Sequence, residues 1–198
     1  MNLPWRGFLA AGATAFFSVL LLGPYLIRLL KGLKLGQSIR QDGPKSHLSK
    51  AGTPTMGGIL ILGGLLAGVI AGAGRPWSNN LRWSLFMTVA CGAIGLADDL
   101  LIIINRRSLG LKARYKLLAQ IVLASLLGVY VIRSGVMETL QAPFTPWHLT
   151  FINPALTFVF VVFVMVSIIN AVNITDGLDG LAAGTSIIAG IALGILAV

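Results

Sequence analysis

Two clusters of acidic and amide side chains interrupt a strongly apolar sequence. In NAVNITDGLDGL, residues 170–181, polar side chains recur at every third position: Asn170, Asn173, Asp176 and Asp179. In GLADDLLIIINRR, Asp98 and Asp99 are adjacent, with apolar residues on both sides. A carboxylate inside a membrane-spanning helix costs roughly 2.5–3.5 kcal/mol, so such residues point to function. A divalent cation, which prefers oxygen ligands, would relieve the repulsion between neighbouring carboxylates.

The Asp98–Asp99 pair also has a structural explanation. These carboxylates could pair with Arg106 or Arg107, which follow in the sequence, or extend toward water. The dipole of a helix disfavours negative charge near its C-terminal end, by about 0.3–1 kcal/mol. Metal binding and pairing with arginine are therefore both open explanations.

The second cluster has a different structural alternative. Asp176 could cap the N-terminus of the last apolar segment, with Asp179 three residues later as in a capping box. Capping is compatible with ligand binding, because a helix N-terminus also attracts phosphate. Capping alone does not account for Asn170 and Asn173.

Two basic segments could bind phosphate. In SKAGTPTMGGILIL, residues 49–62, Lys50 and Thr55 can contact a phosphate or a ribose, although the Walker A spacing is absent and an ordinary loop-to-helix turn is the alternative. The segment NRRSLGLKARYKLLAQ, residues 105–120, includes Arg106 and Arg114. It suits either anionic substrates or anionic lipids.

The elements that must position these residues are membrane helices. Of the 198 residues, 56% are hydrophobic and only 11% are charged, whereas soluble domains have about 25% charged residues. A transmembrane helix needs about 20 apolar residues. We predict an all-α polytopic membrane protein with six spans, at residues 8–30, 54–74, 81–104, 116–133, 152–172 and 180–198. We expect one transmembrane domain over residues 1–198, with cytoplasmic loops at about 31–53, 98–116 and 173–180.

The distribution of charge predicts the orientation. Eleven of the 15 basic residues fall in the segments 28–50 and 105–116, which lie on one side of the membrane if the six spans alternate. The positive-inside rule makes that side cytoplasmic and places the N-terminus outside. The rule also explains the net charge of +9 without nucleic acid as a partner. Five of the six acidic residues reach the same cytoplasmic face, and only Glu138 lies outside.

Together these groups favour one class of chemistry. Carboxylates for a divalent metal, basic groups for phosphates and a hydrophobic wall suit phosphoryl transfer between a nucleotide substrate and a lipid phosphate. An ion-coupled transporter is a remote alternative, because its acids would be expected near the middle of the bilayer.

Four segments resemble one family of membrane enzymes. DGPKSHLSKAGTPTMGGILIL, GLADDL, GLKARYKLLAQ and NAVNITDGLDGLAAG are similar to segments of the phospho-N-acetylmuramoyl-pentapeptide transferases. These enzymes are a branch of the polyprenyl-phosphate N-acetylhexosamine-1-phosphate transferases, which have about ten transmembrane helices. A sister enzyme that uses UDP-N-acetylglucosamine or a related UDP-sugar is the alternative.

The resemblance implies a reaction and its partners. Undecaprenyl phosphate would attack the sugar-linked phosphate of UDP-N-acetylmuramoyl-pentapeptide, giving lipid I and UMP with Mg²⁺ as cofactor. The enzyme would be a phosphoglycosyl transferase of peptidoglycan biosynthesis in the bacterial inner membrane, with its active site on the cytoplasmic face. A homodimer is a candidate assembly.

The resemblance also implies roles for individual residues. Asp98 would be the base or part of the lipid-phosphate site beside Asp99, and Asp179 would lie near the metal and the diphosphate. All three aspartates are therefore candidate catalytic residues and metal ligands. The candidate substrate-binding residues are Lys50, Thr55, Asn170, Asn173, Asp176, Arg106 and Arg114.

The chain departs from the family at two positions. Ile102 and Leu109 stand where lysine is usual, so nearby basic residues, Arg114 among them, would have to compensate. The resemblance places the family's third catalytic aspartate and a histidine-rich loop beyond residue 198. It therefore implies an N-terminal part of a longer enzyme that is inactive alone.

Overall fold

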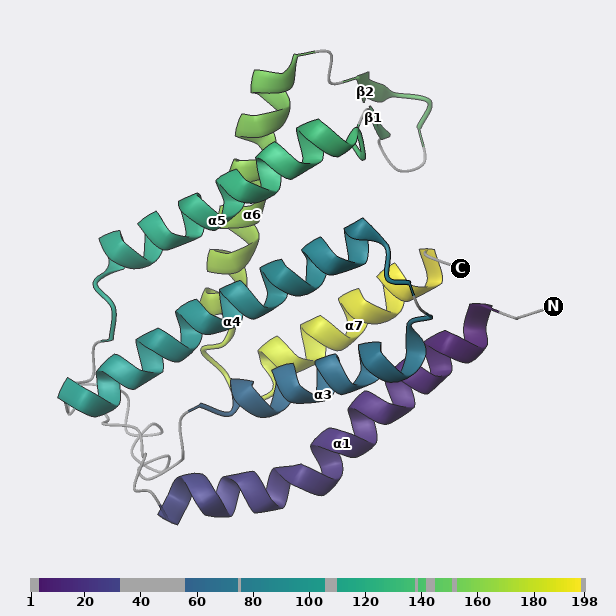
Figure 1. Ribbon diagram of the computed structural model, residues 1–198. Helices are drawn as coiled ribbons and strands as arrows, with labels where there is room; N and C mark the ends of the chain where they lie inside the picture. Colours follow the sequence, from purple (N-terminus) through teal and green to yellow (C-terminus); the bar gives the residue numbers. More distant parts are fainter. Residues whose placement is uncertain are drawn as a thin grey trace. The chain divides into compact units, whose positions relative to one another are not determined.

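The computed structural model describes residues 4–32, 56–74, 76–105, 110–137, 139–141, 145–150 and 153–196 (Figure 1). These residues form six helices and one pair of short strands. The helices are α1 (Pro4–Gly32), α3 (Gly58–Gly72), α4 (Asn79–Asn105), α5 (Ala113–Ser134), α6 (Pro154–Thr175) and α7 (Leu181–Leu196). The strands are β1 (Thr139–Gln141) and β2 (His148–Thr150). The helical architecture confirms the predicted all-α polytopic class.

A helix lies at each of the six predicted spans, but the helices differ in length. Within the described residues, α1, α4, α5 and α6 are long and apolar enough to cross a membrane. The apolar helices α3 and α7 have 15 and 16 residues. At 1.5 Å per residue these measure roughly 22–24 Å, less than the hydrocarbon core of about 30 Å. The number of spans therefore stays a prediction.

Two helices continue into segments that were predicted to be loops. Helix α4 passes through both Asp98 and Asp99 to Asn105, because the apolar run that follows the acids continues the helix. Helix α6 likewise continues through Asn173 to Thr175. The loops predicted at 98–116 and 173–180 are therefore partly helical, and the candidate residues are held by regular structure.

The strands were not expected from the sequence. They lie between α5 and α6 and pair antiparallel, with Thr139 opposite Thr150 and Leu140 opposite Leu149. Three residues per strand are too few to show an alternating pattern in the sequence.

Contacts within the chain divide it into two compact units, Met1–Lys116 and Leu117–Val198. In the first unit α1 packs along α3 (Figure 1). Glycines at every fourth position of α3, Gly64, Gly68 and Gly72, face Ala11 and Ala15 of α1. Small residues at this spacing let two helix backbones approach closely inside a membrane.

Helix α4 completes the first unit by packing against α3. A Cβ atom at Gly92 would collide with the side chain of Leu62, so this contact also depends on a glycine. The packing fixes the direction of α4, which carries the acidic pair toward its C-terminal end.

In the second unit α5 and α6 contact each other at two places. Gln120, Ala124 and Gly128 form the buried face of α5, at a spacing of one helical turn. Gly128 lies against the ring of Phe158, and Gln120 contacts Asn170. The contacts run in opposite directions along the two helices, so α5 and α6 are antiparallel. Helix α7 then packs against α6.

Candidate active site

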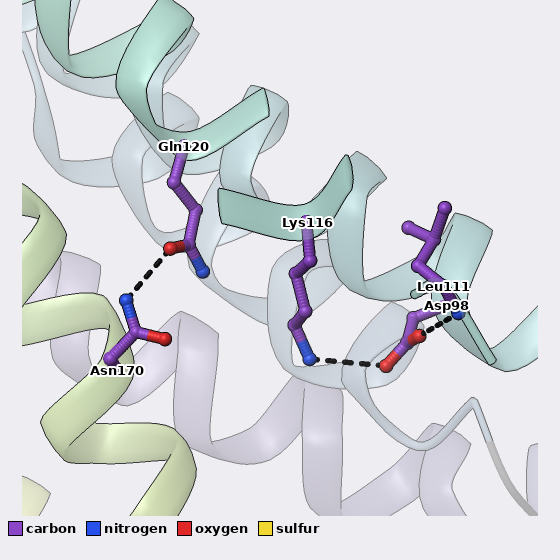
Figure 2. Close-up of polar contacts among 5 residues, drawn as sticks. All are labelled: Asp98, Leu111, Lys116, Gln120 and Asn170. Atoms are coloured by element: carbon purple, nitrogen blue, oxygen red, sulfur yellow. Dashed lines mark hydrogen bonds and ion pairs between the residues drawn. The ribbon is translucent and has the colours of Figure 1, made fainter. Parts of the chain in front are cut away.

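The carboxylate of Asp98 is held by two donors from beyond its own helix (Figure 2). Its Oδ1 accepts a hydrogen bond from the backbone N–H of Leu111 at 2.6 Å, and its Oδ2 accepts one from the ammonium of Lys116 at 3.1 Å. The side chains of Lys116 and Asp98 are only 23% and 22% exposed. This ion pair is therefore screened by water less than a surface pair would be.

Gly110 makes this arrangement possible. A Cβ atom at residue 110 would collide with the carboxylate of Asp98 and would lie 2.6 Å from its carbonyl oxygen. Only glycine lets the loop before α5 approach α4 closely enough for the N–H of Leu111 to reach Asp98.

Asp99 is joined to a different part of the first unit. Its Oδ2 accepts a hydrogen bond of 2.9 Å from the backbone N–H of Met56, the residue that precedes the turn into α3. Met56 is 8% exposed and has a φ of 70°, which is unusual for a residue with a side chain. The partly buried hydrogen bond to Asp99 helps to hold this strained backbone.

Both carboxylates lie near the C-terminal end of α4, where the helix dipole is unfavourable for negative charge. One ammonium and two backbone N–H groups offset this penalty and part of the repulsion between the carboxylates. Within the described residues, Lys116 is the cation paired with Asp98. Arg106 and Arg107, the partners considered above, lie outside the described residues.

Lys116 was not among the residues proposed from the sequence. Lys112, Lys116 and Gln120 lie on one face of a helix at a spacing of four, whereas Arg114 is displaced from that face. This periodicity could have singled out Lys116. Ile102 occupies the position one turn after Asp98 on α4, so the cation comes from α5 and not from α4 itself.

Of the other predicted phosphate-binding residues, Arg114 is described. It is exposed, its guanidinium lies 4.8 Å from the centroid of the Tyr115 ring, and it donates a 3.2 Å hydrogen bond to the Tyr115 hydroxyl. Its role toward a substrate stays a prediction. Lys50, Thr55 and Arg106 lie outside the described residues.

The second unit holds the other candidate cluster. Asn170 is half-buried and donates hydrogen bonds from Nδ2 to Gln120 Oε1 at 2.7 Å and to the carbonyl oxygen of Val166 at 2.8 Å. Figure 2 shows the contact between Asn170 and Gln120. Gln120 was also missed in the sequence, because its partner lies 50 residues away.

Asn173, Asp176 and Asp179 are exposed. The proposed capping role of Asp176 is wrong. Asp176 is the C-cap residue of α6, where its backbone N–H donates to the carbonyl oxygen of Val172, and α7 begins five positions later. Gly180, with a φ of 81°, makes the turn into α7. Asp176 and Asp179 therefore lie in the exposed turn between α6 and α7.

The described residues contain no group of three or more histidine, cysteine or acidic side chains that could hold a metal. Asp98 and Asp99 supply two carboxylates in the first unit, and Asp179 belongs to the second unit. Both oxygens of Asp98 already accept hydrogen bonds. Oδ1 of Asp99 has no protein partner within the described residues, so it is the oxygen best suited to a hard cation such as Mg²⁺.

Two family models match the chain. The model described as glycosyl transferase family 4 matches residues 81–198, which include both acidic clusters. The model described as phospho-N-acetylmuramoyl-pentapeptide-transferase signature 1 matches residues 50–62. This second match includes Met56, the residue that donates to Asp99.

Curated relatives named phospho-N-acetylmuramoyl-pentapeptide-transferase are similar to most of the chain. The relative from Desulfitobacterium hafniense is 45% identical over 187 residues, covering 92% of this chain and 54% of the relative. The relative from Moorella thermoacetica is 45% identical over 181 residues, covering 90% and 55%. The relative from Geobacillus thermodenitrificans is 39% identical over 197 residues, covering 98% and 60%.

The chain thus spans about half the length of the curated relatives it matches. Neither their names nor the described residues support the homodimer considered above. The family model nevertheless covers more than half of the chain and includes both acidic clusters. The chain therefore belongs to glycosyl transferase family 4.

Proposed function

We propose that the protein carrying this chain transfers phospho-N-acetylmuramoyl-pentapeptide from its UDP donor to undecaprenyl phosphate. The products are lipid I, a precursor of peptidoglycan, and UMP. The shared name of the relatives and the signature at residues 50–62 support this reaction. The observation that carries the proposal is the hydrogen bond between Met56, inside that signature, and Asp99 of the acidic pair.

The reaction asks the protein mainly to position its substrates and to balance charge. A phosphate oxygen of the lipid attacks the sugar-linked phosphorus, the bond from that phosphorus to UMP breaks, and the electron pair leaves with UMP. One phosphoanhydride replaces another, so most of the catalysis can come from orientation and electrostatics. We assign Asp98 as the base or lipid-phosphate-site residue, with Lys116 as the cation that holds its carboxylate in place.

The remaining candidates are assigned to the nucleotide side of the site. Asp179 lies near the diphosphate in this proposal, because the stretch NAVNITDGLDGL matches the family in the region of the model match. The nucleotide would be bound by Lys50, Thr55, Asn170, Asn173, Asp176, Arg106 and Arg114. Basic and amide groups of this kind suit phosphates and sugar hydroxyls.

We propose Mg²⁺ as the cofactor. The available donors are carboxylate oxygens, which Mg²⁺ prefers, and Oδ1 of Asp99 is not used by the described residues. Asp99 is the first candidate ligand, with Asp98 and Asp179 as the others. When bound, the ion would neutralise charge on the diphosphate. The protein's own contribution is to hold the carboxylates through Met56, Leu111 and Lys116.

We further propose that the protein is in the bacterial inner membrane with its N-terminus outside and its site at the cytoplasmic face. The four long apolar helices support the membrane location. The concentration of 11 of the 15 basic residues in two segments supports the orientation. The UDP donor is hydrophilic and is therefore expected on the cytoplasmic side.

An assay of both candidate donors tests the proposal. Membranes containing the protein expressed from its own gene are supplied with undecaprenyl phosphate, Mg²⁺ and either UDP-N-acetylmuramoyl-pentapeptide or UDP-N-acetylglucosamine. We expect UMP and a lipid-linked product with the first donor only. Transfer from UDP-N-acetylglucosamine alone would support the sister-enzyme alternative, and no transfer from either donor by folded protein would contradict the proposed reaction.

A further inference from the structure

Both N–H bonds of the Asn170 carboxamide are used inside the protein. Nδ2 has two hydrogens, and it donates to the carbonyl oxygen of Val166 at 2.8 Å and to Gln120 Oε1 at 2.7 Å. Within the described residues, Oδ1 of Asn170 has no hydrogen-bond partner. Asn170 as a whole is half-buried and not fully enclosed. The group that Asn170 offers is therefore an acceptor and not a donor.

The orientation of this amide is determined by its neighbours. Rotating the Asn170 carboxamide by 180° would place Oδ1 against the carbonyl oxygen of Val166, where two acceptors would repel each other. Rotating the Gln120 amide would place its Nε2 against Asn170 Nδ2, where two donors would meet. Figure 2 shows Gln120 Oε1 turned toward Asn170 and the Asn170 oxygen turned away from that contact.

The buried surroundings of Gln120 do not satisfy all of its hydrogen-bonding groups, so packing alone does not explain a glutamine here. It is 1% exposed on a face of α5 that it shares with Ala124 and Gly128. Its Nε2 is buried and has no hydrogen-bond partner within the described residues. A buried donor without a partner is costly, so an apolar side chain would suit this position better if packing were the only requirement.

We propose that Gln120 is a positioning residue that makes Asn170 an obligate hydrogen-bond acceptor for the nucleotide substrate. This inference rests on the proposed function. It assigns Asn170 Oδ1 to a hydrogen-bond donor of the nucleotide, a ribose hydroxyl or the imide N–H of the base. An ionised phosphate has no hydrogen to donate, so Asn170 does not bind the diphosphate.

Two substitutions at residue 120 separate positioning from packing. Gln120→Met removes the acceptor at similar length, while Gln120→Glu keeps an oxygen for Asn170 Nδ2 and removes the unpaired N–H₂. We expect Gln120→Met to raise the KM for the UDP donor about 10-fold, with the KM for undecaprenyl phosphate changed less than about 2-fold. Gln120→Glu should stay within about 3-fold of the unmodified protein for both substrates.

A packing role predicts the opposite order of the two variants. A carboxylate in this buried apolar face would then be worse than methionine, and loss of folded protein would affect both substrates alike. Ser125→Ala is the matched control on α5, because among the described residues the Ser125 hydroxyl bonds to the carbonyl oxygen of Ile121 on its own helix and to no other group. It should leave both KM values unchanged. Gln120→Glu more defective than Gln120→Met would overturn the proposal.

A double-mutant cycle with Asn170→Ala tests whether Gln120 acts through Asn170. We expect each single change and the double change to raise the donor KM by the same factor of about 10. Either single change already removes the contribution of the Gln120–Asn170 pair, so the second change adds no further loss. Multiplication to about 100-fold would contradict the inference, as would a shift confined to the Mg²⁺ dependence. Absence of transfer by the unmodified protein would instead contradict the proposed function, so the two failures are distinguishable.

Discussion

The backbone N–H of Met56 donates a 2.9 Å hydrogen bond to Asp99 Oδ2 across 43 positions of the chain. This contact joins the residues matched by the 50–62 signature to the acidic pair on α4. It uses the main chain of Met56, which has a φ of 70°. The signature segment therefore reaches the acidic pair through its backbone, and the roles of Lys50 and Thr55 stay predictions.

The three candidate catalytic aspartates give the first prediction. Asp98→Asn, Asp99→Asn and Asp179→Asn should each lower turnover at least ~100-fold, which corresponds to about 2.7 kcal/mol of transition-state stabilisation. Each change keeps the shape of the side chain and removes its charge. Turnover is measured as UMP released by membranes containing equal amounts of folded protein. Glu138→Gln is the control, because that acid is predicted to lie outside. Near-normal turnover in all three variants would overturn the site assignment.

Lys116 gives a second prediction, since it is the described cation paired with Asp98. Lys116→Met should lower turnover by roughly 10- to 100-fold, because Asp98 then keeps only the N–H of Leu111 and loses its charged partner. Lys116→Arg should recover part of the loss. The loss of stability should exceed the roughly 0–1 kcal/mol that is usual for an exposed surface pair, because this pair is mostly buried, so turnover is compared at equal amounts of folded protein. The matched control is Lys112→Met, one turn earlier, for which no carboxylate contact is described. Equal losses in both methionine variants would mean that general positive charge matters and not the contact with Asp98.

The close approach of Gly110 to Asp98 gives a third prediction. Gly110→Ala places a methyl group against the Asp98 carboxylate and should pull Leu111 away from it, lowering turnover about 10-fold. The control is Gly95→Ala on α4, because no atom lies within 4 Å of a Cβ built at Gly95. Steady-state assays and detergent melting curves of the two variants are compared. Unchanged turnover in Gly110→Ala would show that the loop can shift without affecting the reaction.

The helices could be predicted from the sequence because long apolar runs dominate it. Each helix lies where an apolar run does, and the acids were recognised because charge is costly among such residues. The loop boundaries around Asp98 and Asn173 were less accurate, since a polar residue does not end a helix whose apolar sequence continues beyond it. The short strands carry too few residues for a pattern.

The partners of the site residues could not be predicted in the same way. Met56 contacts Asp99 through its backbone N–H. Every residue except proline has this group, so the residue type does not indicate the contact. Gln120 reaches Asn170 only because α5 and α6 are antiparallel, a relationship set by tertiary packing. Lys116 could have been found from helical periodicity, but the start of α5 had to be known first. The sequence indicated the candidate side chains, and tertiary packing determines which donors contact them.

The orientation of the chain gives a fourth prediction. In a Cys91→Ala background, Gln37→Cys and Ser108→Cys should resist an impermeant thiol reagent in intact cells, while Gly135→Cys should react. The physical reason is the concentration of basic residues in segments 28–50 and 105–116. Permeabilised cells serve as the control and should label all three sites. Labelling of Gln37→Cys but not of Gly135→Cys in intact cells would reverse the topology.

The packing of α1 on α3 gives the last prediction. Gly68→Ala inserts a methyl group against the carbonyl oxygen and side chain of neighbouring residues of α1, Ala11 and Ala15, and the helices must separate to accept it. Overpacking of this kind costs about 1–3 kcal/mol. Gly63→Ala is the matched control on the same helix, because a Cβ there meets no atom within 4 Å. It should be neutral or stabilising, since alanine favours a helix over glycine by about 1 kcal/mol.

Melting curves in a mild detergent measure the difference between these two variants. We expect the midpoint of Gly68→Ala to fall below that of the unmodified protein, and that of Gly63→Ala to stay equal or rise. Because α3 begins two residues after Met56, separation of α1 and α3 should also disturb the hydrogen bond to Asp99 and reduce turnover in Gly68→Ala. Equal midpoints for the two variants would mean that the glycines of α3 do not support the α1–α3 contact, and that the position of Met56 depends on α4 alone.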